Sequence, residues 1–240
     1  MVKTFNFSKI PFNFKILQNL KIMTTLTTPR RVIIFGGSNA KRIVPFLLQL
    51  TKKKGIRIED RTVSGHSLKD LDNFPKNAEV RKKDFIFILS GGNDIFEKHI
   101  IIHRHFGKAK KICLTKCIPN PISSIQKIYE NLKERLKELK CHKYVITNPY
   151  RHLYSCPEHY DVSYFGNILR AQNAANSCLT KTLKEAAITL KIEKLVGLSC
   201  KEKRKGYPNH MIDSVHFKQK FYLKAAENLC KIVSEKSSSC

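Results

Sequence analysis

Short apolar runs alternate along this chain with longer segments in which apolar residues recur every three or four positions. The run at 84–89 is apolar at almost every position, which is typical of a strand covered on both faces of a sheet. Strands are predicted at 31–35, 55–63, 84–89, 144–147 and 194–198, and helices at 40–53, 121–140, 165–190 and from 217 onward. This order predicts an α/β fold, a flavodoxin-like three-layer α/β/α sandwich with a five-stranded parallel sheet.

The length of 240 residues suits one domain that needs no disulfide bonds. We expect this domain to cover 31–236 and to be followed by a short tail at 237–240. Residues 1–30 contain basic residues and no acidic one, so they are predicted to form a basic extension, either a disordered arm or a mitochondrial presequence. The segment 97–119 is longer than its connection requires and is expected to be an insertion, as an edge strand or a lid.

The eight cysteines are irregularly spaced and form no CxxC pair, which favours reduced thiols in an intracellular, cytoplasmic protein. Cys113 with Cys117, and Cys156 with His159, have only the spacing of half a zinc site, so no metal site is expected. Lysines interrupt the apolar runs near the N-terminus, and no secretory signal or membrane span is predicted. We expect no cofactor.

The formal net charge of +26 indicates attraction to polyanions, such as nucleic acid or an anionic membrane surface. Basic clusters precede the predicted strands at 52–54, 81–83, 140–143 and 191–194. All strands of a parallel sheet begin at one pole, so these clusters are expected to form a basic surface there. Solvated loop tips in a lysine-rich protein explain the same pattern.

Polar or glycine residues follow three of the predicted strands. Ser38 lies in a Gly-Gly-Ser-Asn turn, Gly65 follows the second strand, and Asn93 lies in a Gly-Gly-Asn-Asp turn. Ligands of doubly wound sheets bind beyond the carboxyl ends of the strands, so we expect these residues to converge there. Asp94 is expected to brace its turn, and Asn120 to cap the helix that begins at Pro121.

An acid and a histidine, Asp213 and His216, stand near the C-terminus. A serine becomes a useful nucleophile when a histidine takes its proton and a carboxylate orients the histidine ring. Each residue also fits a purely structural role. Ser38 would then cap a helix, Asn93 would belong to a plain turn, and His216 would lie at a surface helix end.

Taken in order, these segments resemble the SGNH hydrolase superfamily, which includes the GDSL esterases and lipases. The resemblance covers about 32–216 and implies a triad of Ser38, Asp213 and His216. It also implies an oxyanion hole made by the amides of Ser38 and Gly65 and the side chain of Asn93. Asn39 and Arg151 are expected on the substrate side. Gly37 departs from the family pattern, which usually has aspartate before the serine.

Two functions follow. The first is a serine esterase or acyl hydrolase that acts on a small carboxylic ester and uses no metal. The alternative is a nucleic-acid-associated SGNH-like module, of the kind found in mobile-element and RNA-binding proteins, with weak or no hydrolase activity. The triad residues favour the first function, and the charge of +26 favours the second. One chain can combine both.

Overall fold

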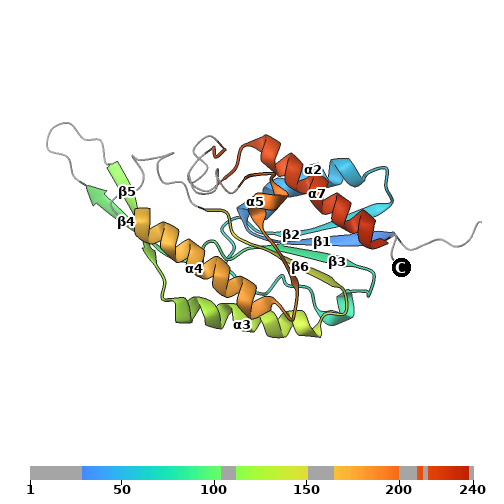
Figure 1. The fold of residues 1–240 in the computed structure, drawn as a ribbon, viewed down its shortest axis with the longest axis horizontal. Helices are drawn as coiled ribbons and strands as arrows, with labels where there is room; N and C mark the ends of the chain where they lie inside the picture. The colour runs from blue at the N-terminus through green and yellow to red at the C-terminus, as the bar shows by residue number, and fades with distance from the viewer. Residues whose placement is uncertain (1–28, 104–111, 151–164, 200–209, 213–215, 238–240) are drawn as a thin grey trace, which may run out of the picture.

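The computed structural model describes residues 29–103, 112–150, 165–199, 210–212 and 216–237. Its main sheet has five parallel strands in the order β2-β1-β3-β6-β7, with helices on both faces, so the predicted fold class is confirmed (Figure 1). The strands are β1 (Arg30–Gly36), β2 (Ile56–Thr62), β3 (Phe85–Leu89), β6 (His142–Ile146) and β7 (Ile188–Leu190).

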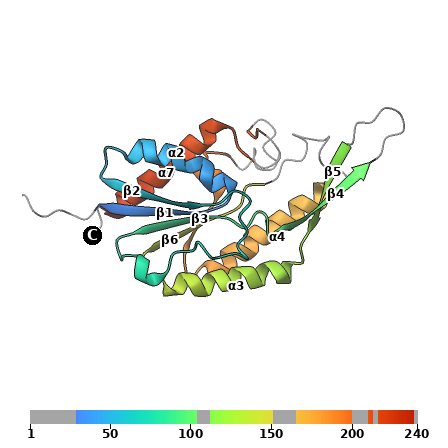
Figure 2. The same cartoon turned by 180° about the vertical axis from the view of Figure 1, so that it is seen from behind.

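Two pairs of helices cover the sheet, as Figures 1 and 2 show from opposite sides. On one face α2 (Ser38–Thr51) packs against α7 (Gln219–Ser237), and on the other α3 (Ile122–Glu138) packs against α4 (Phe165–Leu183). Two short helices, η1 (Asn77–Glu79) and α5 (Ile192–Leu195), complete the order. No helix in the described ranges is long and apolar enough to cross a membrane.

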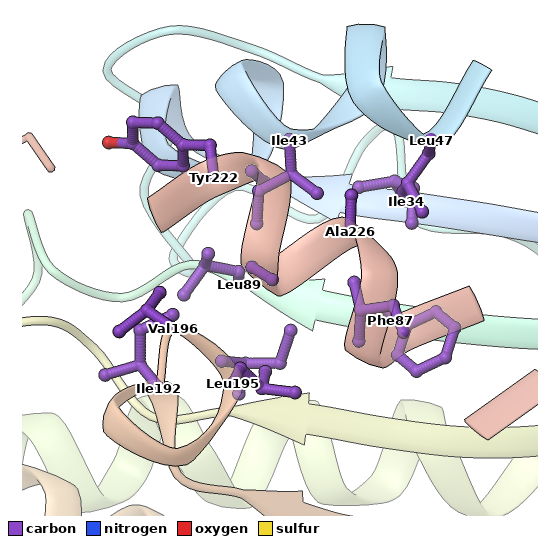
Figure 3. Packing of buried hydrophobic residues seen from close by; sticks show 14 of the residues in the cluster. Ile34, Ile43, Leu47, Phe87, Leu89, Ile192, Leu195, Val196, Tyr222 and Ala226 are labelled. Carbon is purple, nitrogen blue, oxygen red and sulfur yellow. The ribbon is translucent and has the colours of Figure 1, made fainter. Parts of the chain in front are cut away.

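Side chains of the central strands alternate between two hydrophobic cores. In β1, Val32 and Ile34 point into the core under α2 and α7, and Ile33 and Phe35 point into the core under α3 and α4. Successive side chains of a strand face opposite sides, so a strand covered by helices on both sides must be apolar throughout. Figure 3 shows the first core, where Ile34 meets side chains of α2 and α7.

The fifth strand is not where the sequence predicted it. The strand lies at Ile188–Leu190, where Tyr144 of β6 pairs with Ile188, and the predicted strand at 194–198 overlaps α5. Helix α4 therefore ends at Leu183, before the predicted end at 190. A short apolar run fits a buried helix as well as a strand, and here burial of Ile192, Leu195 and Val196 serves a helical turn.

The segment after Ile95 forms a separate two-stranded sheet. Strands β4 (Phe96–His103) and β5 (Ile112–Pro119) pair antiparallel and extend away from the main sheet (Figure 1). The edge-strand interpretation of 97–119 is therefore wrong, because β5 pairs with β4 and not with the main sheet. A role as a lid stays a prediction. The extension at 1–28 and the residues 238–240 lie outside the described residues.

Candidate active site

The turn from β1 into α2 carries Ser38 at the carboxyl edge of the central strands. Gly36 has a φ of 150°, and a Cβ atom there would lie 2.0 Å from the carbonyl oxygen of Leu89, so only glycine fits. The amide of Gly37 donates to the same Leu89 oxygen at 3.1 Å. Gly37 is the N-cap of α2 and makes no side-chain capping bond, so Ser38 is the first helical residue and not its cap.

His216 lies beside Ser38. Its Nε2 is 2.9 Å from the Ser38 Oγ, although the two residues are 178 positions apart in the chain. Two main-chain hydrogen bonds hold the residues on either side of the histidine: the Ile212 amide donates to the His216 carbonyl at 2.8 Å, and the Lys218 amide donates to the His210 carbonyl at 2.8 Å. The ring therefore meets a hydroxyl at hydrogen-bonding distance, the geometry that a nucleophile and its base require.

Two predicted site residues fall outside the described part of the chain. Asp213 belongs to 213–215, and Arg151 belongs to 151–164. Their roles as orienting acid and as substrate-side residue stay predictions. Within the described residues, no group of three or more His, Cys, Asp or Glu side chains is arranged to hold a metal ion.

Tyr222 of α7 connects the segments that carry Ser38 and His216. Its hydroxyl accepts a hydrogen bond from the Phe217 amide at 3.0 Å and donates to the Asn39 Oδ1 at 2.5 Å. Asn39, which was predicted on the substrate side, thus contacts α7. Sequence reasoning missed Tyr222, because a tyrosine on an amphipathic helix carries no local signal of a tertiary hydrogen bond.

The turn that bears Asn93 is braced on both sides. The buried Asp94 carboxylate accepts hydrogen bonds from the Ser67 hydroxyl and, at 2.8 Å, from the Leu68 amide, as expected of a bracing residue. The Nδ2 of Asn120 donates to the Asp94 carbonyl at 2.8 Å, so Asn120 supports this turn and does not cap α3, whose N-cap is Pro121.

Asn93 itself faces the loop after β2. Its Nδ2 donates to the carbonyl of His66 at 3.3 Å, which holds the Asn93 turn against the residue that follows Gly65. Gly65 has a φ of 79° and belongs to the turn in which the His66 amide donates to the Val63 carbonyl at 3.1 Å. The structure therefore brings the Asn93 segment and the Gly65 segment together at the same edge of the sheet as Ser38.

A small cavity of about 40 Å³ opens at this edge. Its lining comes from the turns after β1, β2, β3 and β6 and from α4, and consists of Gly37, Ser38, Asn39, His66, Leu89, Ser90, Gly91, Gly92, Asn93, Asn148, Pro149 and Gln172. His66 lines the cavity, whereas Gly65 is not among these residues. More than half of the lining residues have polar side chains, which suits a small group with oxygen atoms better than a long hydrocarbon chain.

Three polar residues of this wall were not predicted. The Nδ1 of buried His66 lies 2.9 Å from the Ser90 Oγ, which makes a second serine–histidine pair. Asn148 is 3% exposed, and its Nδ2 has no hydrogen-bond partner among the described residues. Asn148 comes just after the end of a predicted strand, and Ser38 and Asn93 also lie within a few residues of strand ends, so the same argument would have found it.

The sequence matches no family model and no curated protein. Solved structures do match its fold. A Parabacteroides merdae protein described as a GDSL-like lipase superposes with a TM-score of 0.56 at 11% identity, over 85% of this chain and 97% of that one. A Streptococcus pneumoniae protein described as a platelet activating factor gives a TM-score of 0.53 at 13% identity, over 94% and 100%.

Phospholipase A1 from Streptomyces albidoflavus gives a TM-score of 0.51 at 9% identity, over 85% of this chain and 99% of that one. These likenesses extend over most of this chain and nearly all of each neighbour, and they confirm the resemblance expected from the sequence at the level of fold. Identities this low do not carry an activity from one protein to another, because one fold supports many functions.

Proposed function

We propose that this chain, whose fold is that of the SGNH hydrolases, is a serine esterase that cleaves small carboxylic esters. The observation that carries the proposal is the 2.9 Å contact between the His216 Nε2 and the Ser38 Oγ. Ser38 is the first residue of α2 and not its cap, and main-chain hydrogen bonds hold both the turn before Ser38 and the segments on either side of His216. A nucleophile already in contact with its base is the central requirement of acyl transfer by serine.

In the first half of the proposed reaction, the Ser38 Oγ attacks the ester carbonyl carbon while the His216 Nε2 takes the hydroxyl proton. The carbonyl oxygen becomes an oxyanion. The C–O bond to the alcohol then breaks, and the alcohol leaves with the proton from His216. Asp213 is proposed to accept a hydrogen bond from the other ring nitrogen, which keeps Nε2 free to act as a base.

In the second half, water attacks the acyl group on Ser38 and gives its proton to His216. Collapse of the second tetrahedral intermediate releases the carboxylic acid and returns the proton to Ser38. The proposed oxyanion donors are the amides of Ser38 and Gly65 and the Asn93 side chain. Each such donor lowers the barrier by about 3 kcal/mol in comparable sites. The bracing of the Asn93 turn by Asp94 supports this role, because a donor must be aligned before charge develops.

The cavity supports a small substrate. A volume of about 40 Å³ with a polar wall suits a short acyl group, and Asn148 offers an amide donor to a carbonyl or hydroxyl of the ester. A buried donor without a partner costs about 1–3 kcal/mol, which a bound substrate would recover. We therefore propose short-chain esters over long-chain lipids.

Covalent labelling with a fluorophosphonate, read by intact mass, tests the proposal. We expect one adduct on the parent protein and none on Ser38→Ala. Ser90→Ala is the informative comparison, because Ser90 also contacts a histidine in the same cavity. If Ser38 is the nucleophile, the Ser90→Ala variant still forms the adduct. Loss of the adduct in Ser90→Ala, with retention in Ser38→Ala, would reassign the nucleophile.

The alternative, a nucleic-acid-associated module with weak or no hydrolase activity, predicts no adduct on a folded parent protein. Circular dichroism establishes that the sample is folded. Hydrolysis of p-nitrophenyl acetate by the unlabelled parent, lost after labelling and in Ser38→Ala, would then favour the esterase. Binding of nucleic acid is a separate property and is measured in a separate assay.

A further inference from the structure

Exposed basic side chains gather where the strands of the main sheet begin. We call this surface the basic pole; it consists of Arg30, Lys52, Lys53, Lys54, Arg57, Lys82, Lys83 and Lys140. Each of these residues is exposed. They come from the start of β1, the end of α2, the start of β2, the turn before β3 and the end of the α3 connection. The pole lies at the end of the sheet away from the β4–β5 ribbon (Figure 2).

Main-chain and side-chain contacts bring these segments side by side. Arg30 pairs with Ile56 and Arg31 with Arg57 in the β1–β2 register, so both strands start together. The Arg81 guanidinium donates to the Pro29 carbonyl at 3.2 Å, and the His142 amide donates to the Asp84 carbonyl at 3.0 Å. The starts of β1, β2, β3 and β6 therefore form one continuous edge.

Acidic residues near this edge are already paired. Buried Asp84 is bound by Arg31 at 2.6 Å and by Arg81 at 3.0 Å, and Glu59 is bound by Arg31 at 3.0 Å and by Arg61 at 2.6 Å. No residue of the basic pole forms an ion pair with any described acidic side chain. The surface consequently presents uncompensated positive charge to solvent.

Several of the predicted basic residues do not belong here. Lys191 and Lys194 were expected before the fifth strand, but that strand ends at Leu190, so both lie at the carboxyl edge of the sheet. Lys143 is half-buried, and its Nζ donates to the carbonyls of Leu136 and Leu139, which closes the end of α3. The basic pole is therefore smaller than predicted, and it is concentrated around β1, β2 and β3.

We propose that the basic pole binds the phosphate backbone of nucleic acid. Cations spread along one edge match a linear array of phosphates, and such contacts are independent of base sequence. An anionic membrane fits less well, because stable docking on a bilayer also needs apolar side chains that insert. Among the exposed large apolar side chains of the described residues, Ile188 is the one at a strand start.

The position of the pole leaves the cavity around Ser38 open, since ligand and cavity occupy opposite ends of the strands. Residues 1–28 join the fold at Pro29, beside the pole, and contain Lys3, Lys9, Lys15 and Lys21 but no acidic residue. A chain anchored through this end would keep its proposed ester site accessible.

Fluorescence anisotropy on the full chain tests this proposal, with a labelled DNA duplex of roughly 30 base pairs and an RNA strand of similar length. Potassium chloride is varied from about 50 to about 200 mM, because a protein with six or more phosphate contacts loses about 10³-fold in affinity over this range. The test variant replaces Lys52, Lys53, Lys54, Lys82 and Lys83 with glutamine. Each contact removed should lower the slope of log K against log salt by about 0.9.

The matched control replaces Lys69, Lys127, Lys191, Lys194 and Lys218 with glutamine, all of them exposed and away from the pole. Both variants have the same net charge, so only the location of the charge differs. We expect at least about 100-fold weaker binding at 100 mM salt for the pole variant and less than about threefold for the control. Equal weakening in both would overturn the proposal, and so would no binding by the parent at the lowest salt.

Binding to phosphatidylserine vesicles tests the remaining possibility, that the basic pole contacts an anionic membrane. If the parent binds these vesicles, the pole variant does not, and neither nucleic acid binds, the surface is a membrane-contact surface and the proposal is wrong. The fluorophosphonate adduct on Ser38 is measured on the same variants. Its retention in the pole variant would show that the variant is folded and that its loss of binding is independent of the proposed hydrolase.

Discussion

The Tyr222 hydroxyl donates a 2.5 Å hydrogen bond to the Asn39 Oδ1, which joins the helix after the candidate base to the residue after the candidate nucleophile. The same hydroxyl accepts from the Phe217 amide at 3.0 Å. Phe217 follows His216 directly, and Asn39 follows Ser38 directly. One side chain therefore holds the relative position of the two segments whose side chains meet at 2.9 Å. Figure 3 shows Tyr222 beside Ile43 of α2.

Replacing this tyrosine should slow turnover more than it weakens substrate binding. For Tyr222→Phe we expect kcat to fall about tenfold with little change in KM, because one hydrogen bond is worth about 1.4 kcal/mol, or tenfold in rate. The effect arises from looser alignment of Ser38 and His216, since Tyr222 is a positioning residue. Steady-state kinetics on p-nitrophenyl acetate and the rate of fluorophosphonate labelling measure it.

Tyr144→Phe is the matched control. It removes a buried tyrosine hydroxyl that has no hydrogen-bond partner among the described residues. Loss of an unsatisfied hydroxyl should leave stability unchanged or raised by up to about 1 kcal/mol, with kcat unaffected. If Tyr222→Phe keeps the kcat of the parent, the bridge does not position the site. If both variants lose turnover equally, the loss reflects general packing.

Asn148 should affect substrate use more than folding. Its Nδ2 lacks a partner within the part of the chain that the structure describes, so Asn148→Leu, which keeps most of the side-chain volume, should change the free energy of unfolding by less than about 1 kcal/mol. Loss of a donor to the substrate should lower kcat/KM by about 10–100-fold. Urea unfolding and the kinetics of a series of short-chain p-nitrophenyl esters give the two quantities.

Asn176→Ala, in contrast to Asn148→Leu, should affect folding strongly. The Asn176 side chain accepts from the Asn148 amide at 3.0 Å and donates to the Asn148 carbonyl at 3.0 Å, in a buried environment. Its removal leaves two buried main-chain groups unsatisfied and should cost about 2–4 kcal/mol of stability. A stability loss as large in Asn148→Leu would show that Asn148 is a structural residue and does not bind substrate.

Asp84 should make the fold sensitive to acid. Burial would raise the pKa of its carboxyl, but hydrogen bonds from the Arg81 amide and from the Arg31 and Arg81 guanidinium groups outweigh burial and lower that pKa. A lowered pKa in the folded state means that the carboxylate stabilises the fold above the ordinary pKa of about 3.9. This contribution is lost as pH falls through the folded-state value.

For Asp84→Asn we expect a loss of about 3 kcal/mol of stability at pH 7, because the variant leaves Arg31 without its buried partner. The difference from the parent should begin to shrink as pH falls below the ordinary pKa of about 3.9, where the carboxyl of the unfolded chain protonates, and it should be lost below the lowered pKa of the folded state. Urea unfolding from pH 7 down to about pH 3 measures this difference in the free energy of unfolding. Glu79→Gln, at an exposed ion pair with Arg61, is the control and should change stability little at any pH. A stability difference between Asp84→Asn and the parent that does not change with pH would contradict this prediction.

The parts of the fold that could be predicted are those determined by local pattern. Unbroken apolar runs identified β1 and β3, and the position of Ser38 after β1 followed from them. The predicted position of the fifth strand was wrong, because the run 194–198 is too short to distinguish a strand from a buried helical turn. The position of the strand is decided by the pairing of Ile188 with Tyr144, a contact between distant segments of the chain.

The same distinction applies to the candidate site. The meeting of Ser38 with His216 could be expected, since both types of residue are needed for one reaction and one sits at a strand end. The role of Tyr222 could not be predicted, because it depends on how α7 packs against α2. Asn120 shows the limit of local rules: its sequence context favours a helix cap, but tertiary packing offers its side chain the carbonyl of Asp94.

The two glycines before Ser38 should respond oppositely to substitution. At Gly37 the backbone has φ −90° and ψ −159°, and an added Cβ would approach no atom more closely than the His66 carbonyl oxygen at 3.8 Å. Gly37→Asp should therefore fit. It supplies the missing N-cap carboxylate of α2, reduces the freedom of the unfolded chain, and should raise stability by about 0.5–1 kcal/mol.

Gly36→Ala is the comparison that makes this prediction specific. Its Cβ would lie 2.0 Å from the Leu89 oxygen, so β1 and β3 would have to separate where the site is built. We expect a loss of more than about 2 kcal/mol and no fluorophosphonate adduct on Ser38. Thermal unfolding followed by circular dichroism, together with labelling, measures both variants. A destabilised Gly37→Asp would mean that the turn tolerates no side chain, and that glycine at this position is required by the fold.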